Sequence, residues 1–214
     1  MKKILFILLF VSVFLLNGCA TSRGEIELSM PVAGERIPSI GTPVYINSVV
    51  SRRAFEQSPM DPSIPSLDSS EVQSGNIKSR AIARKRNTYG KALGDILLKE
   101  GQTVERVILH LLTQALTENG FSIIEAKDKI TYETNIIDVQ INKFWSWMNP
   151  GFSEITLTSE ISTDISYQNI SGVRNESIEV INSDGFMTGS ESNWIEVMEG
   201  ALKEYVIEVK HRFK

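Results

Sequence analysis

The sequence predicts an α+β fold, a two-layer sandwich in which two main amphipathic helices cover one face of a mixed or antiparallel sheet. Residues 103–119 and 193–213 each place apolar side chains at helical spacing, so each helix has one face to bury. Residues 137–167 alternate apolar and polar side chains, which is typical of an antiparallel sheet with one covered face. Helices and a sheet with one apolar face each bury those faces against one another, which gives two layers.

The first elements are strands. Residues 25–30 alternate and predict a short edge strand within a tether that covers residues 19–41. Residues 43–50 alternate more strongly and predict the first long strand. From there we expect a single domain over residues 42–214.

The first helix is predicted over residues 103–119. Thr103 suits its N-cap, and Gly120 suits the left-handed position after its last turn. Residues 121–125 follow directly as a strand. The apolar stripe of this helix consists of Val104, Val107, Ile108, Leu111, Leu112 and Ala115.

The second half predicts a meander and a final helix. The apolar residues of 137–141 and 155–167 have odd numbers, so either the hairpin loop has an odd length or a bulge shifts the register. Residues 177–181 supply another strand. Asn193 is the expected N-cap of the last helix, with Glu196 three positions later.

An aromatic segment lies near the tip of the predicted hairpin. Trp145 and Trp147 are in phase with the apolar face of residues 137–141, so we expect both in the core. Phe144 and Met148 then face the polar side, where exposed apolar groups would form a contact surface.

Residues 52–101 form a long insertion with weak periodicity. Residues 58–74 are rich in proline and serine and predict an irregular loop. Apolar spacing predicts a short helix over residues 91–99, which Gly101 ends. A loop of this length in a compact domain is either disordered or functional.

Six cations gather within residues 72–94, a stretch without Asp or Glu in a net-acidic chain. They are Lys78, Arg80, Arg84, Lys85, Arg86 and Lys91. One interpretation is a binding surface for lipid or lipopolysaccharide phosphates or an acidic protein, since each cation near an anionic bilayer contributes about 1 kcal/mol. The other is a solvated loop whose charges pair with acidic side chains of the sheet. The first interpretation predicts that joint neutralisation of residues 84–86 leaves folding nearly intact.

The N-terminus reads as a secretory signal peptide over residues 1–18. Two lysines precede the apolar run 4–16, which is too short to span a bilayer. The ending Leu16-Asn17-Gly18-Cys19 resembles the bacterial lipobox, and this resemblance implies that Cys19 is acylated and becomes the first mature residue. The alternative is a plain secretory signal with an incidental cysteine. Ala20 after the cysteine resembles the sorting pattern that directs lipoproteins to the periplasmic face of the outer membrane.

Composition argues against a disulfide-stabilised fold and against nucleic-acid binding. Cys19 is the only cysteine, so no internal disulfide forms in an exported chain. The formal charge is −4, and loss of residues 1–18 removes two lysines and no acid, which makes it −6. A charge this mild does not suggest nucleic acid as a partner.

Catalytic and metal-binding motifs are not found in the sequence. His110 and His211 both fall on faces of the predicted helices that we expect to be solvated. Glu160 and Asp164 belong to the polar face of a strand. No cluster has metal-ligand spacing, and neither a nucleophile elbow nor a phosphate loop occurs. We therefore expect no catalytic residue, metal or cofactor, and a protein that is not an enzyme.

One family resembles the chain in pattern. A lipobox, a strand over residues 44–50 followed by Arg52-Arg53, and a Leu-rich helix that leads into Gly120-Phe121 are similar to the YajG-type outer-membrane lipoproteins. The resemblance implies a small α+β periplasmic domain without recorded chemistry. The long insertion between Arg53 and Thr103 departs from that pattern.

The functional hypothesis is a non-enzymatic interaction or assembly component of a cell-envelope complex. It is anchored in the outer membrane through acylated Cys19, with an envelope protein or an anionic lipid as its partner. The alternative is binding or transport of an anionic envelope lipid or polymer, and a cell-wall hydrolase ranks third.

Overall fold

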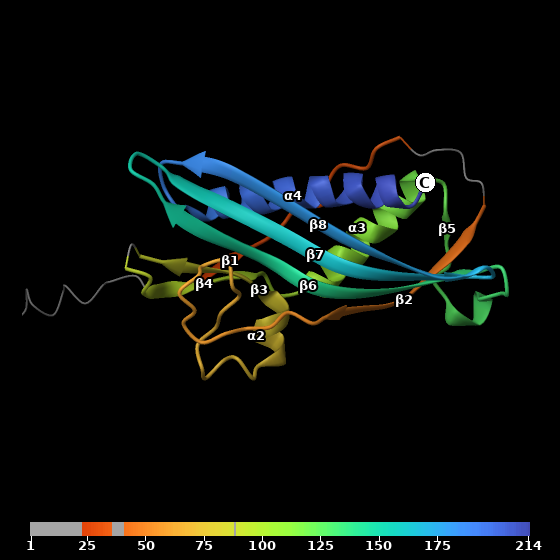
Figure 1. The fold of residues 1–214 in the computed structure, drawn as a ribbon, viewed down its shortest axis with the longest axis horizontal. Coiled ribbons are helices and arrows are strands. Elements are labelled where there is room, and N and C mark those ends of the chain that lie inside the picture. Colours follow the sequence, from red (N-terminus) through yellow and green to blue (C-terminus); the bar gives the residue numbers. More distant parts are fainter. Residues whose placement is uncertain (1–22, 36–40, 88) are drawn as a thin grey trace, which may run out of the picture.

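The computed structural model describes residues 23–35, 41–87 and 89–214, and these build one mixed sheet with helices packed on it (Figure 1). In these residues the sheet has eight strands. The strands are β1 Gly24–Ile26, β2 Pro43–Ser51, β3 Ala81–Arg86, β4 Ala92–Leu98, β5 Ser122–Ile123, β6 Asn135–Pro150, β7 Ile155–Asn169 and β8 Gly172–Phe186. The helices are α2 Gly75–Arg80, α3 Val104–Glu118 and α4 Glu191–Arg212, with a 3₁₀ turn η1 at Lys127–Lys129. The α+β class predicted from the sequence is confirmed.

The long strand β6 is the centre of the sheet. Its whole length pairs antiparallel with β7, and β7 pairs antiparallel with β8. The other edge of β6 is shared: β2 pairs parallel with its first half, and β3 pairs parallel with it at Ser146. Strands β4 and β1 extend the sheet beyond β3, whereas β5 pairs with β2.

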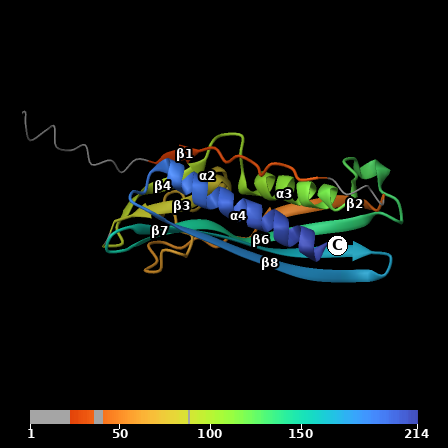
Figure 2. The ribbon, with the colours of Figure 1, turned by 90° about the horizontal axis from the view of Figure 1, so that it is seen from above.

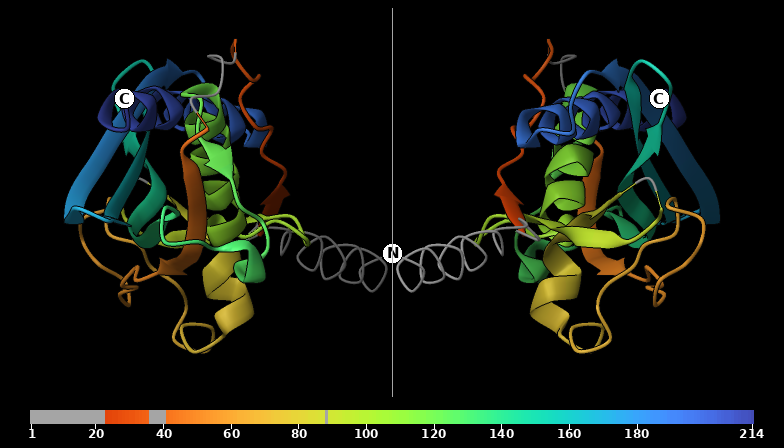
Figure 3. Two further views of the ribbon diagram at one scale, coloured as in Figure 1. Left: turned by 90° about the vertical axis from the view of Figure 1, so that its right-hand side faces the viewer. Right: turned by 90° about the vertical axis from the view of Figure 1, so that its left-hand side faces the viewer.

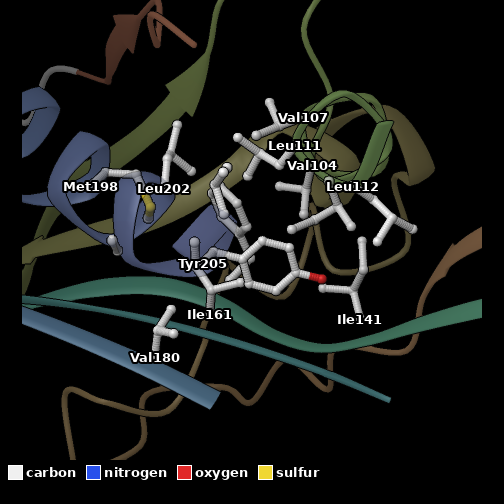
Figure 4. Packing of buried hydrophobic residues seen from close by; sticks show 14 of the residues in the cluster. Val104, Val107, Leu111, Leu112, Ile141, Ile161, Val180, Met198, Leu202 and Tyr205 are labelled. Carbon is white, nitrogen blue, oxygen red and sulfur yellow. The ribbon is translucent and has the colours of Figure 1, made fainter. Parts of the chain in front are cut away.

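Helices α3 and α4 lie on the same face of the sheet (Figure 2). Figure 4 shows the core between them, where Leu111 from α3 and Leu202 and Tyr205 from α4 pack above Ile161 of β7. The Tyr205 hydroxyl lies 2.9 Å from Thr163 Oγ1, so this buried polar group has a partner.

The periodic elements follow the predictions. Strand β2 and helix α3 match the ranges expected from their patterns, and Thr103 caps α3 by accepting a hydrogen bond from the Arg106 N–H at 3.3 Å. Gly120 has a φ of 86°, the left-handed conformation expected after the helix. The last helix begins earlier than predicted, because Ser190 rather than Asn193 takes the N-cap position.

A bulge at Asn142 reverses the phase of β6. The register shifts between Ile141 and Lys143, so the bulge is the alternative that the structure adopts. Phe144 therefore joins Ile141 on the helix-covered face and is fully buried, which corrects the prediction that it faces the polar side. Trp145 is also buried, but on the opposite face.

The described residues of the insertion cover the second face of the sheet at one end. Its residues form α2, β3 and β4, and the helix predicted over residues 91–99 is strand β4 instead. The run Ile96-Leu97-Leu98 is buried on both faces and so has neither helical nor alternating period. In Figure 3, α2 and the segment before it lie on the side of the sheet opposite α4.

A second, smaller core lies under the insertion. Trp145 packs there with Leu67, Ala81 and Leu97, and its indole N–H donates to the Pro62 carbonyl at 3.1 Å. Trp147 is half-buried beside this cluster. A third layer therefore covers this end of the sheet, beyond the two layers predicted.

Residues 23–35 pack against the domain along their length, and we call them the N-terminal strap. Strand β1 pairs parallel with β4, and Leu28 is buried in the main core. The Ser29 N–H donates to Glu199 Oε1 at 2.7 Å, and the Gly34 N–H donates to Glu118 Oε1 at 2.8 Å. The predicted tether over residues 19–41 is thus corrected for these residues. Residues 1–18 and Cys19 lie outside the described residues.

Candidate functional site

The structure divides the six predicted binding cations into two groups. Arg80, Arg84 and Arg86 are buried, with 5%, 8% and 9% of their surface exposed. Lys78 and Lys85 are half-buried, and Lys91 is exposed in the β3–β4 hairpin. The expectation of one accessible surface made by all six is corrected, since the three guanidinium groups are hydrogen-bonded inside the domain.

Arg80 and Arg86 each hold separate segments together. Arg80 donates to the Leu98 carbonyl at 2.7 Å and to Glu25 Oε1 at 2.6 Å, which ties β4 and β1 to the end of α2. Arg86 donates to the Pro59 carbonyl at 2.7 Å and to Ser66 Oγ at 3.0 Å. Burial, followed by the nearby charge of Arg84, lowers the pKa of Arg86. Both arginines are explained as structural residues.

Lys78 and Lys85 have different surroundings. The Lys78 ammonium lies 5.8 Å from the centroid of the Phe55 ring, a cation–π distance. Lys85 lies opposite Gly94 in the β3–β4 ladder. Lys78, Lys85 and Lys91 are therefore the part of the predicted surface that a ligand can reach.

Three carboxylates and two arginines meet where the strap, the insertion and β4 come together. The carboxylate oxygens of Asp68, Glu71 and Asp95 lie within 4.8 Å of one another. Arg23 contacts Glu71 at 2.5 Å and Asp95 at 3.4 Å, and Arg84 pairs with Asp68 and with Asp95. A metal ion would have to displace both arginines, so the cluster is explained as an ion-pair network.

Asp95 is the most deeply buried acid of this network. Burial raises its pKa, and the charges of Arg84 and Arg23 oppose this rise. Its Oδ1 and the Nη1 of Arg84 have no hydrogen-bond partner among the described residues, although Arg84 Nε lies 3.7 Å from Asp95 Oδ1. Sequence reasoning missed this network because Arg23 stands 72 positions before Asp95 and was assigned to the tether.

Arg53 is a further buried cation that sequence reasoning did not place in a structural role. It lies where β2 leaves the edge of β6 and β3 replaces it. Its guanidinium donates to the Ala81 carbonyl at 2.6 Å, to the Phe144 carbonyl at 3.1 Å and to the Lys78 carbonyl. Burial lowers its pKa to about 10. Arg53 thereby satisfies carbonyls at the end of α2 and at the β3–β6 junction.

A groove of about 580 Å³ lies between the strap and α3. Pro31 and Ala33 form one wall, and Leu109, 41% exposed, lies on the helix side. Arg106 and His110 lie one turn apart on α3 and line the same groove. Its shape and lining suit an extended ligand that has apolar and anionic parts.

The far wall of this groove is held by Glu118. Burial alone would raise its pKa, but hydrogen bonds from Lys210, Gln114 and the Gly34 N–H outweigh burial and lower the pKa below its usual value. The Lys210 ammonium lies 2.6 Å from Glu118 Oε2. Glu118 therefore fastens the strap to α3 and α4 as an ionised carboxylate.

A smaller hollow of about 190 Å³ extends the groove toward β2. It shares Arg106 and Leu109 with the groove and adds Ile46 and Val49 of β2. Beyond Val44 no strand of the described residues pairs with the outer edge of β2. The concave surface thus runs from the strap to a free strand edge.

Comparisons with known proteins give a fold match. No family model matches the chain, and no curated protein matches it. A solved structure of an uncharacterised protein has a TM-score of 0.51 at 6% identity, covering 90% of this chain and 99% of that one. This likeness shows that the fold occurs elsewhere.

Two further solved structures have lower scores. A Xanthomonas campestris protein of the DUF330 family model has a TM-score of 0.48 at 11% identity, covering 88% and 92% of the two chains. A minor lipoprotein from Acinetobacter baumannii has a TM-score of 0.36 at 9% identity, covering 52% of this chain and 85% of that chain. At these TM-scores neither structure supports a conclusion about this chain, and the YajG-type resemblance stays a prediction. In the described part of the chain, no helix has the length and apolar character needed to cross a membrane.

Proposed function

We propose that the chain is a lipid-anchored lipoprotein of the outer membrane whose domain faces the periplasm. In this proposal the protein acts without catalysis, as a binding component of a cell-envelope complex. The signal peptide and the lipobox-like ending at Cys19 support the anchor. The fold match is neutral on the role, because it concerns an uncharacterised protein.

The observation that carries the binding role is the groove between the strap and α3. Its walls come from segments far apart in the chain, and Glu118 fixes them to each other. A prearranged groove reduces the ordering cost of binding, so it suits recognition of a partner segment. Leu109 offers apolar contact. Arg106 Nη1 donates to the Gly101 carbonyl at 3.0 Å, and no ion pair of the described residues involves Arg106, so its other N–H groups can meet an acidic group.

One observation favours the alternative of an anionic envelope lipid or polymer. Arg106 and His110 lie on the same wall as the apolar side chains, an arrangement that also fits an anionic amphiphile. A hydrolase has less support. The one cluster of three carboxylates in the described residues is occupied by Arg23 and Arg84, which keeps these acids in ion pairs.

Site-specific photocrosslinking in cells tests the binding role. A photoreactive phenylalanine at Leu109 reports on the groove, and the same residue at Ile207, 58% exposed on α4, is the matched control. The proposal expects one discrete envelope-protein adduct at position 109 that is absent at position 207. A lipid or polymer adduct at 109 would favour the alternative, and equal adducts at both positions would refute a groove-specific role.

Two measurements test the rest of the proposal. Mass spectrometry of the protein from membranes should find a diacylglyceryl-modified Cys19 at the N-terminus, and an unmodified or uncleaved N-terminus would refute the anchor. Purified protein should leave peptidoglycan and phospholipid unchanged. Turnover of either without a partner would refute the non-enzymatic role.

A further inference from the structure

The described part of the chain enters the domain at strand β1, which lies at one end of the sheet. Strand β1 runs parallel to β4, with Gly24 opposite Ile96, so the chain before Gly24 approaches from the side of the β3–β4 hairpin. β3 is parallel to β6, so this hairpin and the β6–β7 hairpin point the same way. Figures 1 and 2 show both hairpins, the end of β8 and the start of α4 together at this end. We call it the entry end.

Three separate connections each expose a large apolar side chain at the entry end. Tyr89 in the β3–β4 hairpin is 93% exposed, and Phe152 in the β6–β7 hairpin is completely exposed. Met187, between β8 and α4, is 83% exposed. Tyrosine is enriched at the membrane–water interface of membrane proteins, and exposed apolar side chains gathered at one place mark protein or membrane interaction sites.

The charges of the entry end have both signs. Lys85 and Lys91 lie on the β3–β4 hairpin, whereas Glu154 lies in the β6–β7 hairpin, Asp184 near the end of β8 and Glu191 at the start of α4. This balance gives no strong attraction to anionic lipid. Contact with a membrane surface at this end therefore depends on the apolar tips, with lysine side chains that can reach toward headgroups.

We infer that the entry end lies against the lipid surface in which the acylated Cys19 is anchored, with Tyr89, Phe152 and Met187 in the interfacial region. This inference rests on the proposed anchor at Cys19. Four residue steps separate Cys19 from Arg23, so a fully extended chain spans at most about 14 Å between them. An anchor this short keeps the entry end close to the bilayer.

The opposite end also exposes apolar side chains, but the anchor does not reach it. Tyr132 and Ile170 are 83% and 80% exposed there. Strand β7 has 15 residues. At about 3.3 Å per residue it separates the two ends by roughly 50 Å. These residues are therefore the matched controls for the inference.

Quenching by brominated lipid tests the contact. The chain from Cys19 to Lys214 is coupled through its single thiol to a maleimide lipid in phosphatidylethanolamine–phosphatidylglycerol vesicles, with or without brominated acyl chains. Tyr89→Trp and Phe152→Trp report on the entry end, and Tyr132→Trp and Ile170→Trp on the other. The unsubstituted chain gives the background of its three native tryptophans.

We expect the tryptophans at 89 and 152 to lose emission in brominated vesicles, while those at 132 and 170 match the background. Absence of quenching at 89 and 152 would overturn the inference, and so would equal quenching at both ends, because the domain would then lie flat. Chemical coupling makes the result independent of acylation in cells. A failed anchor is detected by mass spectrometry of Cys19 and a failed orientation by quenching, so the two are distinguishable.

Discussion

Replacement of Arg84 by methionine should destabilise the domain strongly, although the sequence alone presents this arginine as one of a row of surface cations. Arg84 is 8% exposed and pairs with Asp68 and Asp95, and Asp95 is 3% exposed. Removal of one partner from a buried ion pair costs about 3–5 kcal/mol, because the remaining charge stays buried. Arg23 remains 3.4 Å from Asp95, so we expect the lower limit, about 3 kcal/mol.

Urea unfolding followed by tryptophan fluorescence measures this loss as a lower midpoint at an unchanged slope. For a domain of this size, 3 kcal/mol corresponds to a fall in Tm of roughly 6–12 °C. Lys85→Met is the control, since Lys85 is the half-buried neighbour in the same strand. It should change stability by no more than about 0.5 kcal/mol, as for an ordinary surface substitution.

A second variant tests the physical reason. If the cost arises from Asp95 left without its cation, Asp95→Asn added to Arg84→Met should restore at least half of the loss. If Arg84→Met alone were as stable as Lys85→Met, the structural role of Arg84 would be refuted. A double variant no better than the single one would show that lost packing, and not the uncompensated charge, causes the effect.

Three further predictions concern the other buried contacts. Arg53→Lys should lower the free energy of unfolding in urea by about 2 kcal/mol, because an ammonium on a shorter stem leaves buried carbonyls without donors; a loss below about 0.5 kcal/mol would contradict this. Trp145→Ala should cost about 3–5 kcal/mol and half-buried Trp147→Ala clearly less, so equal losses in Tm would contradict the observed register. Glu118 has a lowered pKa in the folded state, so its contribution is present above the unfolded value of about 4.3 and is lost as the pH falls through the folded value. Tm measured against pH should therefore fall less steeply below about pH 4.3 in Glu118→Gln than in the parent, and parallel curves would refute the role of Glu118.

The elements that the sequence predicts well are those whose burial has a period. Helix α3 buries one stripe, and strands β6 and β7 bury one face, so spacing alone locates them. The bulge at Asn142 limits this reasoning. The apolar positions of both strands have odd numbers, which indicates either an odd-length loop or a bulge that shifts the register. The sequence does not show at which residue a bulge would lie, because that depends on how the two strands pair. Because of the extra residue Asn142, Phe144 faces the helices and Trp145 faces the insertion.

The insertion could not be predicted because its residues are buried on both faces or pair with distant charges. Strand β4 lies between two covered faces, which removes the alternation that identifies a strand. The same limit applies to the arginines. Arg80 pairs with Glu25, 55 positions away, and Arg84 pairs with Asp68, 16 positions away. A count of charges within residues 72–94 therefore indicates a basic segment, although in the folded chain these arginines are paired with acids outside it.

The strap and the insertion stabilise each other, and this has a consequence for how an anchor would act. Arg23 pairs with Glu71 of the insertion and with Asp95 of β4, while β1 pairs with β4 directly behind it. Two ion pairs and a strand ladder thus fix the position and direction in which the chain leaves the domain. An acyl group on a free tether would leave the orientation of the domain open, because flexible segments allow many arrangements. If Cys19 is acylated as proposed, at most about 14 Å of chain would separate the lipid from the fixed start of the strap, and the domain would be restricted to orientations that bring the entry end to the lipid.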